Sequence, residues 1–308
     1  MKIAVIGTGG VGGSFGAALA KAGADLTFVA RGAHLAAMQG NGLRVEGGRG
    51  ETVIRPVQAT DNIAHIGAVD IVLFCVKLWD VEAVGKQLRP LLGPDTAVIP
   101  LQNGVDAAHW LVAILGPTAV MNGTVAVSAT IDRPGVIRQT GKMMSLTFGE
   151  IDGRMTPRAE RFHALCDSAG FDVALSDNIA VPLWIKFLAL TAMSGCTAVT
   201  RLPIGNLRDD PEIFAWFESV MRETEAVGRA EGVALPADTV DKLITLTKSL
   251  PPETRASMAV DLSRGNRLEL AWLAGRVVEL GRKHRIPTPS NWGIYVALKP
   301  YANGAPPP

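Results

Sequence analysis

In the first half of the chain, short apolar runs rich in β-branched residues alternate with segments of helical character. The runs that predict strands are Lys2–Ile6, Asp25–Ala30, Asp70–Val76 and Ala97–Leu101. The segments between them that predict helices are Gly10–Ala22 and Trp79–Arg89. Strands that alternate with helices indicate a parallel sheet joined by helical crossovers. The pattern therefore predicts an α/β domain built on a doubly wound parallel sheet.

Two more segments of this half have strand character. Gly42–Arg55 is rich in glycine and predicts a pair of short strands. Thr118–Gly149 is strand-like and contains Arg133-Pro134-Gly135, a turn sequence typical of an antiparallel pair. We expect this pair to complete the sheet.

Beyond about Ser176 the period of the apolar positions changes from two to 3.6, which predicts an all-helical second half. The positions at helical spacing include Ile213, Phe217, Val220, Met221, Thr224 and Val227, and then Leu270, Leu273, Ala274, Val277 and Gly281. Helix-capping residue types at 176–178 precede a long apolar helix with Pro182 in its first turn. We therefore expect one domain over residues 1–175, a helical domain over 176–302, and a disordered tail over 303–308.

Composition excludes several classes of protein. The 308 residues contain 30 Lys+Arg and 29 Asp+Glu, so a net charge of +1 gives no general attraction to nucleic acid or an anionic membrane. The chain has three widely spaced cysteines, Cys75, Cys166 and Cys196. An odd number at such spacing does not support a disulfide framework and favours a protein of the reducing cytoplasm. The uncharged apolar stretch Phe187–Thr200 is too short to span a bilayer, and no export signal is found. The five histidines have no metal-ligand spacing, so no metal is expected.

A glycine-rich loop follows the first predicted strand. Gly7-Thr8-Gly9-Gly10-Val11-Gly12 has both the spacing and the strand–helix context of a dinucleotide fingerprint. The three spaced glycines permit a tight turn, close approach of backbone to a pyrophosphate, and close helix–strand packing. The alternative is a glycine-rich turn that binds nothing. An overlapping Gly-x-Ser-x-Gly hydrolase pattern at 12–16 is discounted, because Ser14 falls inside the helix and not at its turn.

The residue after the second strand indicates which dinucleotide is bound. An NAD-binding protein places an acidic residue there to bind the ribose 2′-hydroxyl, but this chain has Arg31, and Asp25 is at the wrong end of the strand. A guanidinium can pair bidentately with a 2′-phosphate, so NADP(H) is favoured over NAD. The alternative is that Arg31 is only a solvated residue at the start of a helix.

Polar residues at strand ends are candidates for the ligand-binding edge of the sheet. Lys77 and Asn103 each follow an apolar run, although either residue alone could be an ordinary loop residue. Lys186 is the only charged residue between Ile179 and Thr200, and burial would lower its pKa toward the range of proton transfer. Its alternative is a lysine that extends its ammonium to the surface. For Glu269, spacing alone favours a first-turn residue that complements a helix dipole.

Together these residues resemble the ketopantoate reductase (2-dehydropantoate 2-reductase) family over nearly the whole chain. The matching pieces are the loop Gly7–Gly12, Arg31, Val76-Lys77, Gln102-Asn103-Gly104, Leu183-Trp184-Ile185-Lys186-Phe187, Pro203-Ile204-Gly205-Asn206-Leu207-Arg208, Ala256-Ser257-Met258 with Asp261, and Glu269. The resemblance implies an N-terminal Rossmann-type domain, a C-terminal all-helical domain and an active site in the cleft between them. It also implies that NADPH reduces a 2-oxo acid, ketopantoate, to D-pantoate in pantothenate biosynthesis.

The resemblance also implies roles for single residues. Lys186 would be the general acid that binds and protonates the substrate ketone, and Glu269 would accept a hydrogen bond from the substrate's distal hydroxyl. Ser257 would bind the substrate carboxylate. Asn103 and Lys77 would line the junction of cofactor and substrate. Arg31 would bind the 2′-phosphate, and the loop from Gly7 through Gly10, Val11 and Gly12 would bind the pyrophosphate.

Three substrate-site positions depart from the family pattern. Members of the family carry asparagines where this chain has Leu190, Ser194 and Ile204. An apolar pocket discriminates weakly between substrates, so a bulkier or more apolar 2-oxo acid is an alternative substrate. The retained Glu269 and Ser257 favour ketopantoate.

Two alternative functions stay open at this point, and a third is disfavoured. One is a D-2-hydroxyacid dehydrogenase of the same fold, and another is an NADP-binding redox sensor without activity, which the isolated Lys186 disfavours. An opine-type dehydrogenase would usually have a catalytic histidine–aspartate pair, which this chain lacks. Phe214, Trp216 and Phe217 lie in one run and cannot all be hidden on one helix face, so a homodimer through the helical domain is expected.

Overall fold

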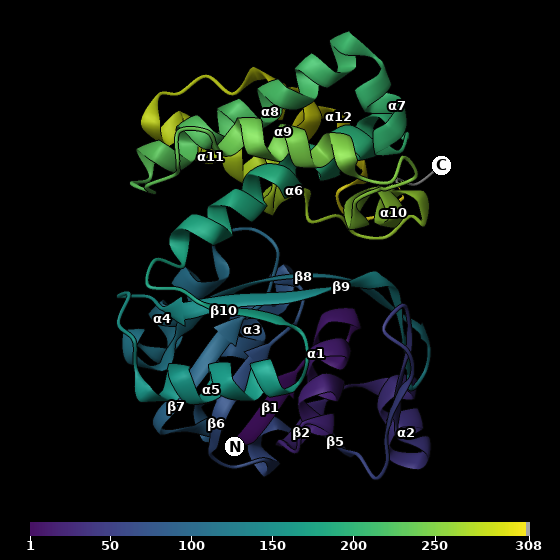
Figure 1. Cartoon of the computed structure of the whole chain (residues 1–308), viewed down its shortest axis with the longest axis vertical. Helices are drawn as coiled ribbons and strands as arrows, with labels where there is room; N and C mark the ends of the chain where they lie inside the picture. The colour runs from purple at the N-terminus through teal and green to yellow at the C-terminus, as the bar shows by residue number, and fades with distance from the viewer. Residues whose placement is uncertain (306–308) are drawn as a thin grey trace. The chain divides into compact units, whose positions relative to one another are not determined.

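Residues 1–305 are described by a computed structural model (Figure 1). Contacts divide the chain into a first unit of residues 1–102 and 106–179, and a second unit of residues 103–105 and 180 onward. This division falls between Ile179 and Ala180, slightly beyond the expected boundary at 175. Of the expected disordered tail, Asn303 forms a β-bridge with Arg267, and residues 306–308 lie outside the described residues.

The first unit contains a five-stranded sheet with the order β5-β2-β1-β6-β7, in which every neighbouring pair is parallel. Its strands are β1 (Lys2–Ile6), β2 (Asp25–Val29), β5 (Gln58–Thr60), β6 (Val69–Phe74) and β7 (Leu92–Pro100). The associated helices are α1 (Gly10–Lys21), α2 (Gly32–Asn41), α3 (Val81–Gly85) and α4 (Ala107–Leu115). The central strands are continuous apolar runs because both of their faces are buried. The predicted helix Trp79–Arg89 is shorter than expected, since Leu78–Asp80 and Arg89–Leu91 are 3₁₀ turns on either side of α3.

A second sheet holds the remaining strands of this unit, β3 (Leu43–Gly47), β4 (Thr52–Ile54), β8 (Met121–Arg133), β9 (Val136–Glu150) and β10 (Asp172–Leu175). Its order is β10-β9-β3-β4, and β8 pairs with β9 as an antiparallel hairpin (Figure 1). The hairpin and the short pair β3–β4 are confirmed. The expectation that the hairpin completes the parallel sheet is wrong, because β8 and β9 join this separate sheet. Helix α5 (Pro157–Ser168) precedes β10.

Glycines on α1 allow the helix to pack closely against both sheets. A Cβ on Gly10 would lie 2.0 Å from the carbonyl oxygen of Ala129 in β8. A Cβ on Gly16 would lie 2.4 Å from the ring of Phe28 in β2. Since backbone and a buried ring cannot move away cheaply, these positions exclude larger residues, and the two sheets and α1 share one apolar core.

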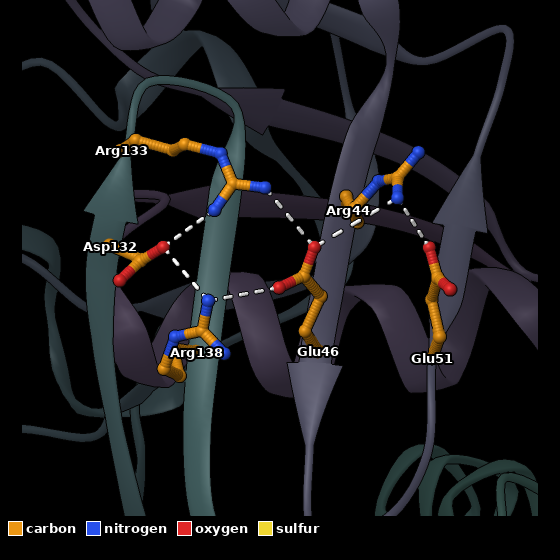
Figure 2. Close-up of polar contacts among 6 residues, drawn as sticks. All are labelled: Arg44, Glu46, Glu51, Asp132, Arg133 and Arg138. Atoms are coloured by element: carbon orange, nitrogen blue, oxygen red, sulfur yellow. Dashed lines mark hydrogen bonds and ion pairs between the residues drawn. The ribbon is translucent and has the colours of Figure 1, made fainter.

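A network of charged side chains crosses the second sheet, and Figure 2 shows its members, Arg44, Glu46, Glu51, Asp132, Arg133 and Arg138. Glu46 in β3 is its centre, with 3.3 Å to Arg133 and 3.1 Å to Arg138. Asp132 pairs with both of those arginines. The network therefore ties the turn of the β8–β9 hairpin to β3.

The second unit is helical. Its helices are α6 (Ala180–Thr200), α7 (Ile204–Asp209), α8 (Pro211–Ala230), α9 (Thr239–Ser249), α10 (Ser257–Ser263), α11 (Ala274–His284) and α12 (Pro289–Leu298). Helix α6 supplies Phe187, Ala192 and Cys196 to the core of this unit. By length and composition alone, this 21-residue helix, which is longer than its uncharged stretch Phe187–Thr200, could cross a membrane. Most of its apolar segment is buried inside the unit, as in the core helix of a soluble protein.

Candidate active site

The glycine loop has the backbone geometry of a dinucleotide site. Gly7 has a φ of +97°, and a Cβ there would lie 3.0 Å from the backbone of Cys75 and Val76. A Cβ on Gly9 would meet nothing within 4 Å, so this glycine leaves open space in front of the start of α1. Thr8 fixes the loop because its N–H and its hydroxyl both donate to the carbonyl of Val29, each at 3.0 Å. The space at Gly9 is where a pyrophosphate would approach the backbone.

A pocket of about 250 Å³ opens beside this loop. Four of the residues predicted to bind cofactor line it: Gly7, Gly9, Arg31 and Lys77. The other loop positions, Gly10, Val11 and Gly12, begin α1 and do not line it. Gly12 has a packing role, since a Cβ there would lie 2.2 Å from the carbonyl oxygen of Gly7. The lining residues fit a nucleotide with a phosphate near Arg31.

Arg31 occupies the position that its sequence context predicts. It is the N-cap residue of α2, its side chain makes no capping hydrogen bond, and the first turn of α2 holds no acidic residue. The side chain is exposed and forms no ion pair within residues 1–305. A guanidinium available in this way can bind a phosphate group.

Other pocket residues come from segments that sequence patterns did not connect with the loop. His34 lies in the first turn of α2, Asp61 follows β5, and Ile131 belongs to β8. The ring of His34 accepts a hydrogen bond at Nδ1 from the N–H of Gly135, at 3.0 Å, and burial lowers the pKa of this histidine. His34 was missed because no helix was predicted over α2. Asp61 and Ile131 were missed because β5 is only three residues long and the hairpin was expected to complete the parallel sheet.

The second unit contains a row of three hydrogen-bonded polar groups. Lys186 Nζ donates to Asn103 Oδ1 at 3.2 Å, and Asn103 Nδ2 donates to Glu269 Oε2 at 3.1 Å. Lys186 lies on α6, and Glu269 is 6% exposed. Glu269 precedes a 3₁₀ turn (Leu270–Trp272) and not the first turn of the long helix α11, so it does not serve the helix dipole that its spacing favoured.

The environment of Lys186 adjusts its proton affinity. Burial lowers the pKa of Lys186 from 10.5 to about 8, while the charge of Glu269 acts in the opposite direction. Burial disfavours the charged ammonium because it removes solvation. A lysine with a pKa near neutral pH is suited to proton transfer. Lys186 is half-buried, and its ammonium donates to the half-buried Asn103.

The end of β7 is fixed by the side chain of Gln102. The side-chain Nε2 of Gln102 donates to the carbonyl oxygens of Phe74 and Val76, at 2.9 and 3.0 Å. These bonds fasten the end of β7 to the segment that follows β6.

The expected substrate-binding residues differ in exposure. Leu190 is partly buried on α6, one turn beyond Lys186. Ser194 and Ile204 have no exposed surface, and Ile204 belongs to the apolar core of the second unit. Ser257 is exposed at the start of α10. Leu190 and Ser257 are thus accessible, whereas Ser194 and Ile204 support the unit from inside.

Metal ligation has no support among residues 1–305. No group of three or more His, Cys, Asp or Glu side chains in this part of the chain could hold a metal ion.

Two family models match the chain, "Ketopantoate reductase PanE/ApbA" over residues 3–153 and "Ketopantoate reductase PanE/ApbA C terminal" over residues 178–302. The chain belongs to the ketopantoate reductase family. This membership confirms the family resemblance, the predicted fold class and the oxidoreductase class. Ketopantoate reductases use NADH or NADPH as reductant.

Individual members of the family are similar over the whole chain. A 2-dehydropantoate 2-reductase from Mesorhizobium japonicum is 33% identical, over 94% of each protein. The crystal structure of a PanE/ApbA family ketopantoate reductase from Ralstonia eutropha aligns with a TM-score of 0.89 at 32% identity, over 98% of each chain. A structure of D-mandelate dehydrogenase with NADH and anilino(oxo)acetate aligns with a TM-score of 0.88 over 98% of each chain. At 19% identity, this last likeness shows a shared fold alone.

Proposed function

We propose that the chain is a 2-dehydropantoate 2-reductase, which reduces ketopantoate to D-pantoate with NADPH in pantothenate biosynthesis. The observation that carries the proposal is the row Lys186–Asn103–Glu269, a proton donor of lowered pKa beside a buried carboxylate. The similarity to 2-dehydropantoate 2-reductases over the whole chain supports the same substrate.

The residues around the glycine loop would hold the cofactor. The open space at Gly9 and the N–H groups at the start of α1 suit the pyrophosphate, and Arg31 suits the 2′-phosphate. Lys77, whose ammonium lies 5.5 Å from the centre of the Trp79 ring, adds positive charge to the same pocket. When bound, NADPH supplies a hydride to the carbonyl carbon of the substrate.

Lys186 would act at the carbonyl oxygen. Its ammonium donates a hydrogen bond to the ketone, stabilises the negative charge that develops on this oxygen, and transfers a proton to it. The product is a hydroxyl, and the neutral lysine then regains a proton from water. A pKa of about 8 keeps most of the lysine protonated at neutral pH and makes the transfer easier than for an exposed lysine.

The other polar groups would orient the substrate. Glu269 accepts a hydrogen bond from the hydroxyl at the far end of ketopantoate, and Asn103 holds Lys186 and Glu269 at a fixed separation. Ser257, exposed at the start of α10, would bind the substrate carboxylate. A site that offers a hydrogen-bond acceptor to a substrate hydroxyl discriminates against analogues without that hydroxyl, so Glu269 favours a hydroxylated substrate.

A bulkier or more apolar 2-oxo acid is the second candidate substrate. Leu190 is accessible one turn from Lys186, and the hydroxyl of Ser194 is fully buried, so this side of the lysine offers little hydrogen bonding. Such a pocket accepts apolar substituents without selecting strongly among them.

Steady-state assays that follow NADPH absorbance with a panel of 2-oxo acids test the proposal. We expect ketopantoate to have the highest kcat/KM of the panel. An equal kcat/KM for a branched aliphatic or aromatic 2-oxo acid would contradict the assignment of ketopantoate as the specific substrate. Binding of NADPH without oxidation by any 2-oxo acid would instead indicate a redox sensor.

A Lys186→Ala variant tests the role of the lysine. We expect kcat to fall by about 10²–10⁴, which is the usual contribution of general acid catalysis. The affinity for NADPH should stay unchanged, which provides a check that the variant is folded. A near-normal kcat in this variant would contradict the role of Lys186 as the general acid.

The cellular setting is also part of the proposal. A cytoplasmic location is supported by three cysteines that are all free, two of them buried. The expected homodimer stays a prediction, and sedimentation of the purified protein would test it.

A further inference from the structure

Asp61 lies at the same end of the sheet as Arg31. Strand β5 pairs with β2 in parallel, with Thr60 opposite Val29, and the N–H of Ala30 donates to the carbonyl of Thr60 at 3.1 Å. Asp61 is the residue after Thr60, so it stands beside the segment that leads from β2 to Arg31. Both side chains line the pocket beside the glycine loop.

The two side chains are available to a ligand. Arg31 and Asp61 are exposed, and neither forms an ion pair or a side-chain hydrogen bond with another residue in the described range. The pocket therefore offers a guanidinium and a carboxylate from neighbouring strands. Asp80, which also lines it, follows β6, two strands away from β2 in the sheet.

A carboxylate and a guanidinium recognise different adenosine riboses. A carboxylate accepts hydrogen bonds from the 2′- and 3′-hydroxyls of NADH, whereas a guanidinium pairs with the 2′-phosphate of NADPH. The carboxylate also repels that phosphate. In this chain the usual position for the acidic residue, the end of β2, holds Arg31, and Asp61 brings the carboxylate from the next strand.

We propose that Asp61 is a ribose-binding residue that lets the chain bind NADH as well as NADPH. Arg31 favours the phosphorylated cofactor, Asp61 favours the unphosphorylated one, and their opposition keeps the two affinities close. This inference rests on the proposed function only in that the pocket takes a nicotinamide dinucleotide. It does not depend on which 2-oxo acid is reduced.

Binding measurements on the protein without substrate test the proposal. Dissociation constants for NADPH and NADH are measured by nucleotide fluorescence, and those for 2′,5′-ADP and 5′-ADP by titration calorimetry. The variant is Asp61→Asn, with Asp61→Ala as a second variant. The matched control is Asp25→Asn, which removes the same charge from an exposed residue at the opposite end of β2.

We expect wild-type affinities for NADH and NADPH within about a hundredfold of each other, since charged hydrogen bonds contribute on that scale. Asp61→Asn should weaken the binding of NADH by about tenfold, because charge-assisted hydrogen bonds are about twice as strong as neutral ones. The affinity for NADPH should stay unchanged or increase. The affinity for 5′-ADP should change as that for NADH does, and the affinity for 2′,5′-ADP as that for NADPH does. The control variant Asp25→Asn should change none of these affinities. Equal weakening of both cofactors, or no change in NADH affinity, would overturn the proposal. Because no 2-oxo acid is present, a failure of the proposed substrate leaves these results unaffected.

Discussion

The ammonium of Lys186 lies 3.2 Å from the side-chain oxygen of Asn103. An ammonium can only donate and a carboxylate can only accept, so the amide of Asn103 must turn its oxygen to Lys186 and its NH₂ to Glu269. The orientation of the Asn103 amide is thus set by a cation on one side and an anion on the other. Each of its partners is constrained in position by its hydrogen bond to the amide.

Replacing Asn103 tests this relay. Asn103→Ala leaves Lys186 and Glu269 without their bridging partner, and we expect kcat with ketopantoate to fall by about tenfold, the effect of one misplaced charged hydrogen bond. NADPH affinity, measured by fluorescence, should change little if Asn103 acts only through the row. Asn103→Asp adds a negative charge beside Lys186, so the pKa of the lysine should rise and the pH profile should shift to higher pH. A profile that does not move would show that Asn103 does not set the state of Lys186.

The pH dependence of kcat/KM, which reports the pKa values of the free enzyme, follows from the lowered pKa of Lys186. The protonated form is the acid, and its pKa of about 8 lies below the ordinary 10.5. Activity should therefore be constant below about pH 7 and should fall about tenfold per pH unit above pH 8, as the lysine loses its proton. In Lys186→Arg the side chain stays charged, so the residual activity should lack this alkaline loss. Persistence of the same loss in that variant would assign it to another group.

Gly9 and Gly10 are adjacent, yet we expect their alanine variants to fail in different ways. Gly10→Ala places a Cβ against the Ala129 carbonyl, which should lower the free energy of unfolding by about 1–3 kcal/mol in urea titrations. Gly9→Ala points into open space, so its stability should stay within about 0.5 kcal/mol of wild type. Its NADPH affinity should fall by about tenfold or more because the methyl group occupies the pyrophosphate space. Normal NADPH affinity in Gly9→Ala would contradict the placement of the pyrophosphate.

Glu46 is expected to contribute modestly to stability. Glu46→Gln removes one shared carboxylate from Arg44, Arg133 and Arg138, which keep their pairs with Glu51 and Asp132 (Figure 2). Because the arginines are about half exposed, screening limits the effect, and we expect the Tm to fall by only a few degrees. In about 1 M salt the difference between variant and wild type should disappear. A loss that is independent of salt would indicate packing and not charge.

Local patterns were sufficient for much of the first unit. The central strands of the parallel sheet are continuous apolar runs, and the glycine loop is recognisable because strand, loop and helix are contiguous in sequence. Arg31 lies at the start of α2, directly after a strand that the apolar pattern predicted. The short β5 has no distinctive pattern, so Asp61 could not be connected with Arg31 before the pairing of β5 with β2 was known.

The sequence by itself determined the fold class, the dinucleotide loop and the unusual character of Lys186, a single charge in an apolar helix. Only the tertiary structure decided what that lysine contacts, since Asn103 lies 83 positions away from it and Glu269 lies 166 positions from Asn103. It also decided that Ile204 belongs to the core and that the β8–β9 hairpin belongs to a second sheet. The reason is physical: apolar periodicity and turn residues act between near neighbours, whereas a buried hydrogen bond between distant residues depends on how whole elements pack.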